Sequence, residues 1–247
     1  MTEYAHDAVV PDDSSDLSKK KQVAEMFDRI AFRYDFLNRF LSGGIDIRWR
    51  KKALAELKPL KPKQVLDVAT GTGDFAILAQ KLLQPDKVTG IDISTGMLEL
   101  GRKKVEQLHL SGNISLLTGD SETINFSDNS FDAVTVAFGV RNFENLETGL
   151  KEMLRVLKPG GKLVVLEFSK PSTAGIKSLY SLYMKVIAPG LGKMIAKNKE
   201  AYAYLNRSVQ AFPERNAFTA ILDKTGFSKT YFKPLSLGIC CIYCGSK

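Results

Sequence analysis

The chain alternates between short apolar runs and stretches whose hydrophobic residues recur at helical spacing. The runs that predict strands lie near 64–69, 87–92, 114–118, 132–137 and 162–168. The stretches that predict helices lie near 74–83, 95–108 and 145–157. Residues 213–247 add a helix and two strand-like runs, 228–233 and 237–244. This alternation predicts an α/β fold with a mostly parallel, seven-stranded sheet and helices on both faces.

Two helical segments fall outside the alternating pattern. Residues 18–60 precede the first strand, and Pro59 and Pro62 mark the boundary of the sheet domain at residues 61–247. Residues 172–211 form a second helical insertion within that domain. We expect both segments to form a lid over the sheet edge and to select the substrate.

The most informative stretch is Val65 to Asp74, where an apolar strand runs into a glycine turn and then a helix. Gly71 and Gly73 permit a tight turn and bring bare backbone N–H groups to a ligand. The same spacing satisfies the relaxed fingerprint of dinucleotide enzymes. Asp67, four residues before Gly71, would repel a pyrophosphate but could hold the amino group of S-adenosylmethionine. We therefore interpret the turn as a methyl-donor site.

Two more acids follow strand-like runs. Asp92 ends the second run, 25 positions after Asp67, about where an acid that binds ribose hydroxyls is found. Asp120, followed by Ser121, comes after the third run. One acid of this kind is as readily a helix cap or turn residue. Three acids after three successive strands predict a ligand site at the carboxyl edge of the sheet.

Charge is distributed unevenly along the 247 residues. Residues 1–16 carry five acids and no Lys or Arg, so we expect 1–17 to be a disordered acidic tail without features of a secretory signal. Setting those acids aside raises the formal charge from +8 to +13. Residues 170–199 hold six lysines and no acid, interleaved with apolar residues. This stretch is a candidate surface for an anionic membrane, although packing on the sheet explains its apolar face equally well.

Candidate metal ligands are few. Cys240, Cys241 and Cys244 lie close together in the last strand-like run, but adjacent strand residues point to opposite faces and no fourth ligand is near. We expect buried thiols and no metal site. His6 lies in the acidic tail and His109 in an expected surface loop, so no histidine is an obvious catalytic base.

The residues Leu66 to Asp74, with Asp92 and Asp120, resemble the Rossmann-like class I S-adenosylmethionine-dependent methyltransferases. Further local motifs, in this order, resemble the menaquinone/ubiquinone biosynthesis C-methyltransferase family from about residue 18 to the C-terminus. They are Tyr34-Asp35-Phe36-Leu37-Asn38, Arg48-Trp49-Arg50, Phe138-Gly139-Val140-Arg141-Asn142, Leu166-Glu167-Phe168-Ser169-Lys170-Pro171 and Tyr202-Ala203-Tyr204-Leu205-Asn206-Arg207-Ser208.

The resemblance implies transfer of a methyl group from S-adenosylmethionine to a ring carbon of a polyprenylated hydroquinone. Thr72, Asp92, Asp120 and Ser121 match the family's cofactor-binding positions, and the glycine turn adds Asp67, Gly71 and Gly73. Demethylmenaquinol is the favoured substrate, and the benzoquinol of ubiquinone synthesis remains the alternative.

Methylation of a phenol ring carbon requires the hydroxyl to ionise. If the phenol titrates near 10, forming its anion at pH 7 costs roughly 4 kcal/mol. A guanidinium about 4 Å away stabilises the anion by about 4 kcal/mol at an effective dielectric near 20. We therefore expect Arg141 to hold the phenolate while water takes the proton, with Asn142 orienting it and Tyr34 and Asp35 bordering the pocket.

Other functions remain open at this point. An RNA methyltransferase would also use the cofactor fold and a basic surface, whereas Asp67 and Asp120 count against a nicotinamide dehydrogenase. A binding protein without catalytic activity is a third alternative. We favour the quinol, without nucleic acid as a partner, in the cytoplasm and with peripheral contact at the inner face of the membrane. The oligomeric state is open, with a homodimer as one option.

Overall fold

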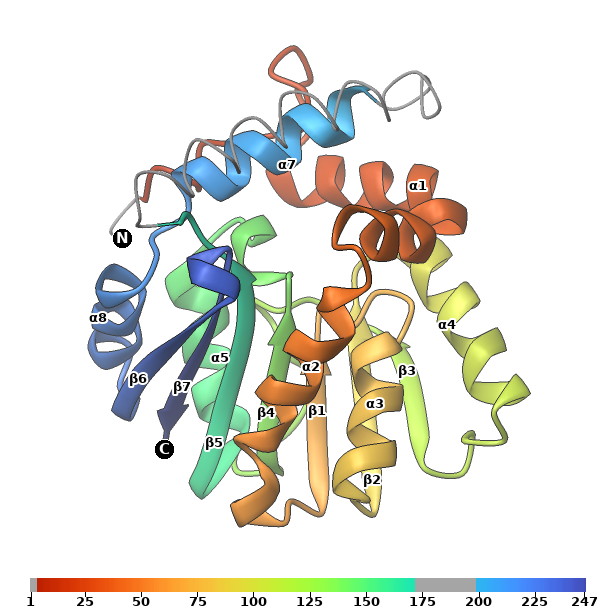
Figure 1. Ribbon diagram of the computed structural model, residues 1–247, viewed down its shortest axis with the longest axis vertical. Coiled ribbons are helices and arrows are strands. Elements are labelled where there is room, and N and C mark those ends of the chain that lie inside the picture. Colours follow the sequence, from red (N-terminus) through yellow and green to blue (C-terminus); the bar gives the residue numbers. More distant parts are fainter. Residues whose placement is uncertain (1–3, 172–198) are drawn as a thin grey trace.

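The computed structural model describes residues 4–171 and 199–247. Seven strands form one sheet in the order β3-β2-β1-β4-β5-β7-β6 (Figure 1). Their bounds are β1 Gln64–Val68, β2 Lys87–Asp92, β3 Ile114–Thr118, β4 Phe131–Ala137, β5 Leu157–Phe168, β6 Ser228–Leu235 and β7 Cys240–Ser246. The first five pair in parallel, and β7 runs antiparallel to both of its neighbours. The predicted α/β architecture is confirmed.

Helices cover both faces of the sheet. The α-helices are α1 Lys19–Leu41, α2 Ile45–Ala55, α3 Asp74–Leu83, α4 Thr95–Gln107, α5 Leu146–Val156, α7 Lys199–Ala211 and α8 Asn216–Lys224. Alternate strand residues face opposite sides, so Val65 and Val164 pack with α2, α3 and α4, whereas Leu66 and Val165 pack with α5 and α8. Strands that are apolar on both faces thus require helices on both sides.

Two differences from the predicted elements have local causes. The helical segment 18–60 is broken after α1, where Gly43 and Gly44 adopt φ angles of 57° and 75°. The last strand begins at Cys240 instead of 237, because Ser236 and Leu237 have positive φ angles and form a short 3-10 helix. As predicted, the thiols of Cys240, Cys241 and Cys244 are buried on β7.

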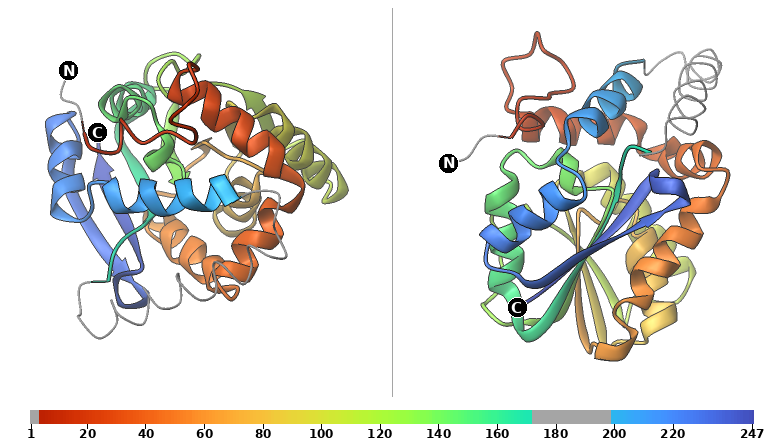
Figure 2. Two further views of the ribbon diagram at one scale, coloured as in Figure 1. Left: turned by 90° about the horizontal axis from the view of Figure 1, so that it is seen from above. Right: turned by 60° about the vertical axis from the view of Figure 1, so that its left-hand side comes forward.

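Helices α1 and α7 lie across the carboxyl edge of the sheet, where the loops after β1, β2 and β4 meet (Figures 1 and 2). Tyr204 of α7 is 2% exposed and packs against Val23 and Met26 of α1. This is the edge at which the lid was expected, and a lid movement stays a prediction. The predicted insertion at 172–211 is described only from residue 199, so the basic stretch proposed as a membrane surface lies outside the described residues except at its two ends, Lys170 and Lys199. Within the described parts, no helix is long and apolar enough to span a bilayer.

Residues 4–17 differ from the disordered tail that the acids predicted. The Tyr4 hydroxyl donates to Glu147 (2.6 Å), and Arg207 of α7 binds both Asp13 (2.6 Å) and the carbonyl of Val10 (2.8 Å). The side chain of His6 is fully buried. The high density of acids predicted disorder. In the structure, Asp13 and the carbonyl of Val10 instead bind Arg207, which is distant in sequence.

His6 makes the docking of this segment sensitive to pH. Burial, reinforced by Lys19, lowers the His6 pKa from 6.5 to about 3, although Asp7 Oδ1 lies 3.3 Å from Nε2. Between pH 3 and pH 6.5, His6 is protonated when the segment is released and neutral when it is docked. Docking is therefore complete above pH 6.5 and weakens as the pH falls towards 3. At pH 5 the loss is about 2 kcal/mol. We expect hydrogen exchange to show lower amide protection in residues 4–17 at pH 5 than at pH 7.

His6→Gln is the control, since its amide does not titrate and the pH difference should disappear. Equal protection of the wild-type segment at both pH values would contradict this prediction.

Candidate functional site

The glycine turn after β1 has the backbone geometry that its sequence predicts. Ala69, Gly71 and Gly73 have φ angles of 52°, 57° and 76°. A Cβ on Gly71 would meet nothing within 4 Å, so this stretch of backbone is open to a ligand. The Gly71 N–H donates to Asp92 Oδ2 (2.7 Å) and thereby joins the turn to the end of β2.

Asp67 lies beneath this turn rather than in the pocket. It is 1% exposed and accepts hydrogen bonds from the hydroxyls of Thr70 (2.6 Å) and Thr135 (2.7 Å). Burial raises its pKa to about 6, while the two hydroxyls and Arg50 oppose the shift. The expected contact with the cofactor's amino group is therefore not supported by this geometry, because Asp67 is buried and is not among the residues that line the cavity.

A cavity of roughly 650 Å³, partly open to solvent, lies above the turn. It is lined by Lys20, Val23, Phe27, Tyr34, Ala69, Gly71, Asp92, Ile93, Met97, Gly119, Asp120, Ser121, Glu122, Ala137, Phe138, Gly139, Asn142, Phe143 and Glu144. The structure thus brings together Gly71, Asp92, Asp120, Ser121, Tyr34 and Asn142, as predicted from the sequence.

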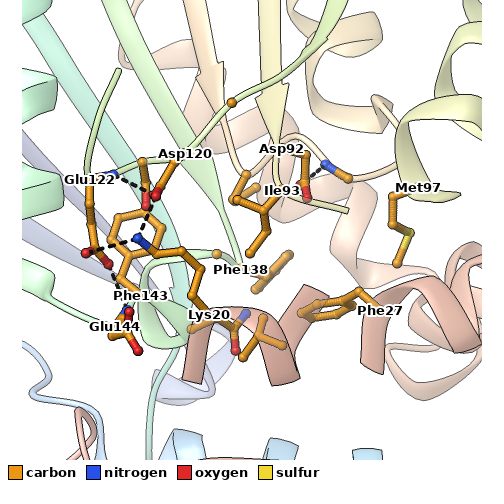
Figure 3. A pocket seen from close by; sticks show the side chains of 18 of the residues that line it. Lys20, Phe27, Asp92, Ile93, Met97, Asp120, Glu122, Phe138, Phe143 and Glu144 are labelled. Carbon is orange, nitrogen blue, oxygen red and sulfur yellow. Dashed lines mark hydrogen bonds and ion pairs between the residues drawn. The ribbon is translucent and has the colours of Figure 1, made fainter. Parts of the chain in front are cut away.

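The polar groups are concentrated at one end of the cavity. Asp120 Oδ2 pairs with Lys20 Nζ (2.5 Å), and Asp120 Oδ1 accepts from the N–H of Glu122 (2.9 Å) (Figure 3). Asp92 lies further along the cavity and accepts N–H bonds from Gly71 and Ser94. Phe27, Met97 and Phe138 supply apolar surface (Figure 3). The arrangement suits a ligand with a polar heterocycle, vicinal hydroxyls and an apolar stretch.

Helix α1 is held over the cavity by polar contacts from several of its residues. Besides Lys20, Asp28 accepts from the Ser94 hydroxyl (2.5 Å) and the Gly96 N–H (2.9 Å). Asp35 accepts from the hydroxyl of Thr72 (2.6 Å). Thr72 is 2% exposed, so its hydroxyl faces α1 rather than the cavity. Gly73 likewise is not among the lining residues and instead precedes α3.

Arg141 is buried behind the cavity wall, contrary to the expectation of a guanidinium directed at the substrate. It is 5% exposed, and its Nη1 donates to Glu167 Oε1 (2.8 Å) and to the Phe138 carbonyl. Glu167 is fully buried, and burial raises its pKa although Arg141 opposes the shift. The positive charge is therefore largely compensated, and Arg141 holds the 138–142 turn in place.

Asn142, the next residue, does line the cavity. The hydroxyl of Tyr204 donates to its Oδ1 (3.1 Å), which orients the carboxamide and leaves its NH₂ group to donate to a ligand. Tyr34 of α1 also lines the cavity, with its ring edge-on to Phe27 at 5.7 Å between centroids.

Sequence reasoning missed Lys20, Phe138 and the partnership of Glu167 with Arg141. Glu167 did carry a signal, because an acid inside an apolar strand needs a buried cation. Lys20 belongs to a run of three lysines, and nothing local distinguishes it from Lys19 and Lys21. Among the described residues, no cluster of His, Cys, Asp or Glu could hold a metal ion.

Comparison with known proteins places this geometry in a family. Solved structures show the fold: a SAM-dependent methyltransferase from Thermotoga maritima has a TM-score of 0.62 at 22% identity, covering 91% of this chain and 99% of that one. A phosphoethanolamine N-methyltransferase from Haemonchus contortus, in complex with S-adenosyl-L-methionine, has a TM-score of 0.63 at 16% identity, covering 94% and 60%.

Curated relatives are closer in sequence. The demethylmenaquinone methyltransferase of Bacteroides fragilis is 49% identical over 95% of this chain and 96% of its own. The ubiquinone/menaquinone biosynthesis C-methyltransferase UbiE of Geotalea daltonii is 46% identical over 93% and 97%. The profile of the ubiE/COQ5 methyltransferase family matches residues 15–247. The chain therefore belongs to the ubiE/COQ5 methyltransferase family.

Proposed function

We propose that this protein transfers a methyl group from S-adenosylmethionine to a ring carbon of demethylmenaquinol, giving menaquinol. The observation that carries the proposal is the cavity at the carboxyl edge of the sheet, which joins Asp92, Asp120 and the open glycine turn to an apolar wall. The relatives named demethylmenaquinone methyltransferase favour the naphthoquinol over the benzoquinol.

The cavity residues fit the methyl donor. Asp92 would accept from the ribose hydroxyls, and Asp120 with Ser121 would meet the adenine amino group and ring edge. Lys20 of α1 pairs with Asp120, the same carboxylate that would bind the adenine. The position of α1 and occupancy of the site are therefore linked. When bound, the cofactor supplies an electrophilic methyl group.

The protein's remaining task is to stabilise the phenolate. Because Glu167 compensates Arg141, a lone guanidinium is not the source of the roughly 4 kcal/mol that ionisation costs. A preorganised hydrogen-bond donor contributes about 2.7–4 kcal/mol, and the NH₂ group of Asn142, oriented by Tyr204, would be such a donor. Asn142 would therefore hold the phenolate oxygen, Arg141 and Tyr204 would position Asn142, and Tyr34 would border the ring. Water would take the hydroxyl proton. When the methyl group moves from sulfur to the ring carbon, the hydrogen on that carbon would be lost as a second proton to water, which restores the aromatic ring.

The substrate assignment is tested by transfer of labelled methyl to reduced demethylmenaquinone, with the reduced benzoquinone precursor and total RNA in parallel. We expect label in the naphthoquinol. Label in RNA alone would overturn the substrate, and label in the benzoquinol alone would move the protein to ubiquinone synthesis.

The role of Asn142 is tested by two substitutions of different charge. Asn142→Ala should lower kcat about 100-fold because the donor is lost, and Asn142→Asp should lower it further because an anion would face the phenolate. Calorimetric binding of S-adenosylhomocysteine should be unchanged in both variants. Activity of Asn142→Asp equal to or above that of Asn142→Ala would contradict the donor role.

Access to a polyprenylated substrate calls for contact with the bilayer, and α1 offers a described surface for it. Phe32 is 88% exposed between the exposed Arg29 and Arg33, on the helix that also lines the cavity through Tyr34. We propose that this face of α1 meets anionic lipid.

Vesicle flotation tests this contact. Phe32→Ser should weaken binding to anionic vesicles roughly 10-fold, since an inserted aromatic side chain contributes about 1.5–3 kcal/mol. Leu108→Ser is the matched control, because Leu108 is 43% exposed just after the end of α4. Equal binding of wild type and Phe32→Ser would exclude this surface.

A further inference from the structure

Arg50 of α2 is a buried cation whose guanidinium is incompletely satisfied. The residue is 8% exposed, and its Nε has no hydrogen-bond acceptor. The nearest ion pair, from Nε to Asp46 Oδ2, is 3.7 Å long and exceeds hydrogen-bond distance. A buried guanidinium in this condition is costly unless an anion joins it. The position therefore suits an incoming carboxylate.

The acids around Arg50 are already occupied. Both carboxylate oxygens of Asp67 accept hydrogen bonds from threonine hydroxyls. Asp74 pairs with Lys104 (2.6 Å) and Arg39 (3.3 Å). Arg50 nevertheless contributes to lowering the pKa of Asp74, so its positive field reaches the residue that follows the glycine turn. None of these acids gives the guanidinium a bidentate partner.

Arg50 also adjoins one particular end of the cavity. Its guanidinium carbon lies 5.3 Å from the ring centroid of Phe138 and 5.9 Å from that of Phe75. Phe138 lines the cavity, and Phe75 is in the first turn of α3 after Gly73. With adenine at Asp120 and ribose at Asp92, the amino-acid part of the cofactor would extend to the remaining lining, which includes Gly71 and Phe138.

We propose that Arg50 binds the α-carboxylate of S-adenosylmethionine and of its product. This assignment rests on the cofactor placement proposed above and extends it to the methionine end. The planar guanidinium, which lies over the rings of Phe75 and Phe138, presents a fork that matches a carboxylate, and burial strengthens the interaction. Binding the carboxylate there would direct the sulfonium, and with it the methyl group, towards the Asn142 side of the cavity.

Calorimetry on the full chain with two ligands tests the assignment: S-adenosylhomocysteine and its analogue that lacks the α-carboxyl group. In Arg50→Met, affinity for S-adenosylhomocysteine should fall roughly 10- to 100-fold, the amount expected for a charge-assisted hydrogen-bonded pair. Affinity for the decarboxylated analogue should not change. Arg50→Lys keeps the positive charge but not the planar fork, so it should lose less affinity for S-adenosylhomocysteine than Arg50→Met does. Arg48→Met, on the exposed side of the same helix, is the matched control and should leave both affinities unchanged.

Equal weakening for both ligands, or none for either, would overturn the assignment. The first result would reduce Arg50 to support of the fold. The cofactor placement has its own check: Asp92→Asn should weaken both ligands alike, because the ribose is common to them. Unchanged binding of both ligands in Asp92→Asn would overturn the cofactor placement and, with it, the role of Arg50. The identity of the methyl acceptor affects neither of the two measured affinities.

Discussion

The buried carboxylate of Asp67 fixes the turn on which the site depends. A charge with 1% exposure is tolerated only when its oxygens are satisfied, and the hydroxyls of Thr70 and Thr135 satisfy them. The first of these bonds ties the start of the glycine turn to β1, and the second ties β1 to β4. With the turn held in its positive-φ conformation, the Gly71 N–H reaches Asp92 and brings the ends of β1 and β2 into one site. An acid that looked like a ligand from the sequence acts here as a brace.

The same network continues into the helix that covers the cavity. Asp92 accepts from the N–H of Ser94, whose hydroxyl donates to Asp28 of α1, and Thr72 donates to Asp35 one heptad later on the same helix. Residues spaced by seven lie on one helix face, so one side of α1 meets the loops after β1 and β2. The cofactor loops and their cover are thus one hydrogen-bonded unit. A change at either part is expected to be felt at the other.

Two arginines near the cavity illustrate how partners decide what a charge can do. Arg141 has a buried carboxylate partner, so it stiffens the 138–142 turn and positions Asn142 instead of presenting a free cation. Arg50 has only a 3.7 Å ion pair with Asp46, and its Nε has no hydrogen-bond acceptor, so its charge is less fully satisfied. Both guanidinium groups lie over aromatic rings, Phe168 for Arg141 and Phe138 for Arg50. In the function proposed here, the amide of Asn142 serves the substrate side of the cavity and the guanidinium of Arg50 serves the methionine side.

The sequence by itself determined the alternating elements, the glycine turn and the acids at the ends of β2 and β3, because periodicity, glycine geometry and strand order act locally. It also placed Tyr34 and Asn142 at the cavity through their motifs. Tertiary structure alone decided which charges are free. Asp67 accepts a hydrogen bond from Thr135, 68 residues away, and Arg141 pairs with Glu167, 26 residues away. Residues 4–17 are held by Arg207, which lies far along the chain. Pairing across such separations depends on how the sheet and helices fold together, which no local pattern encodes.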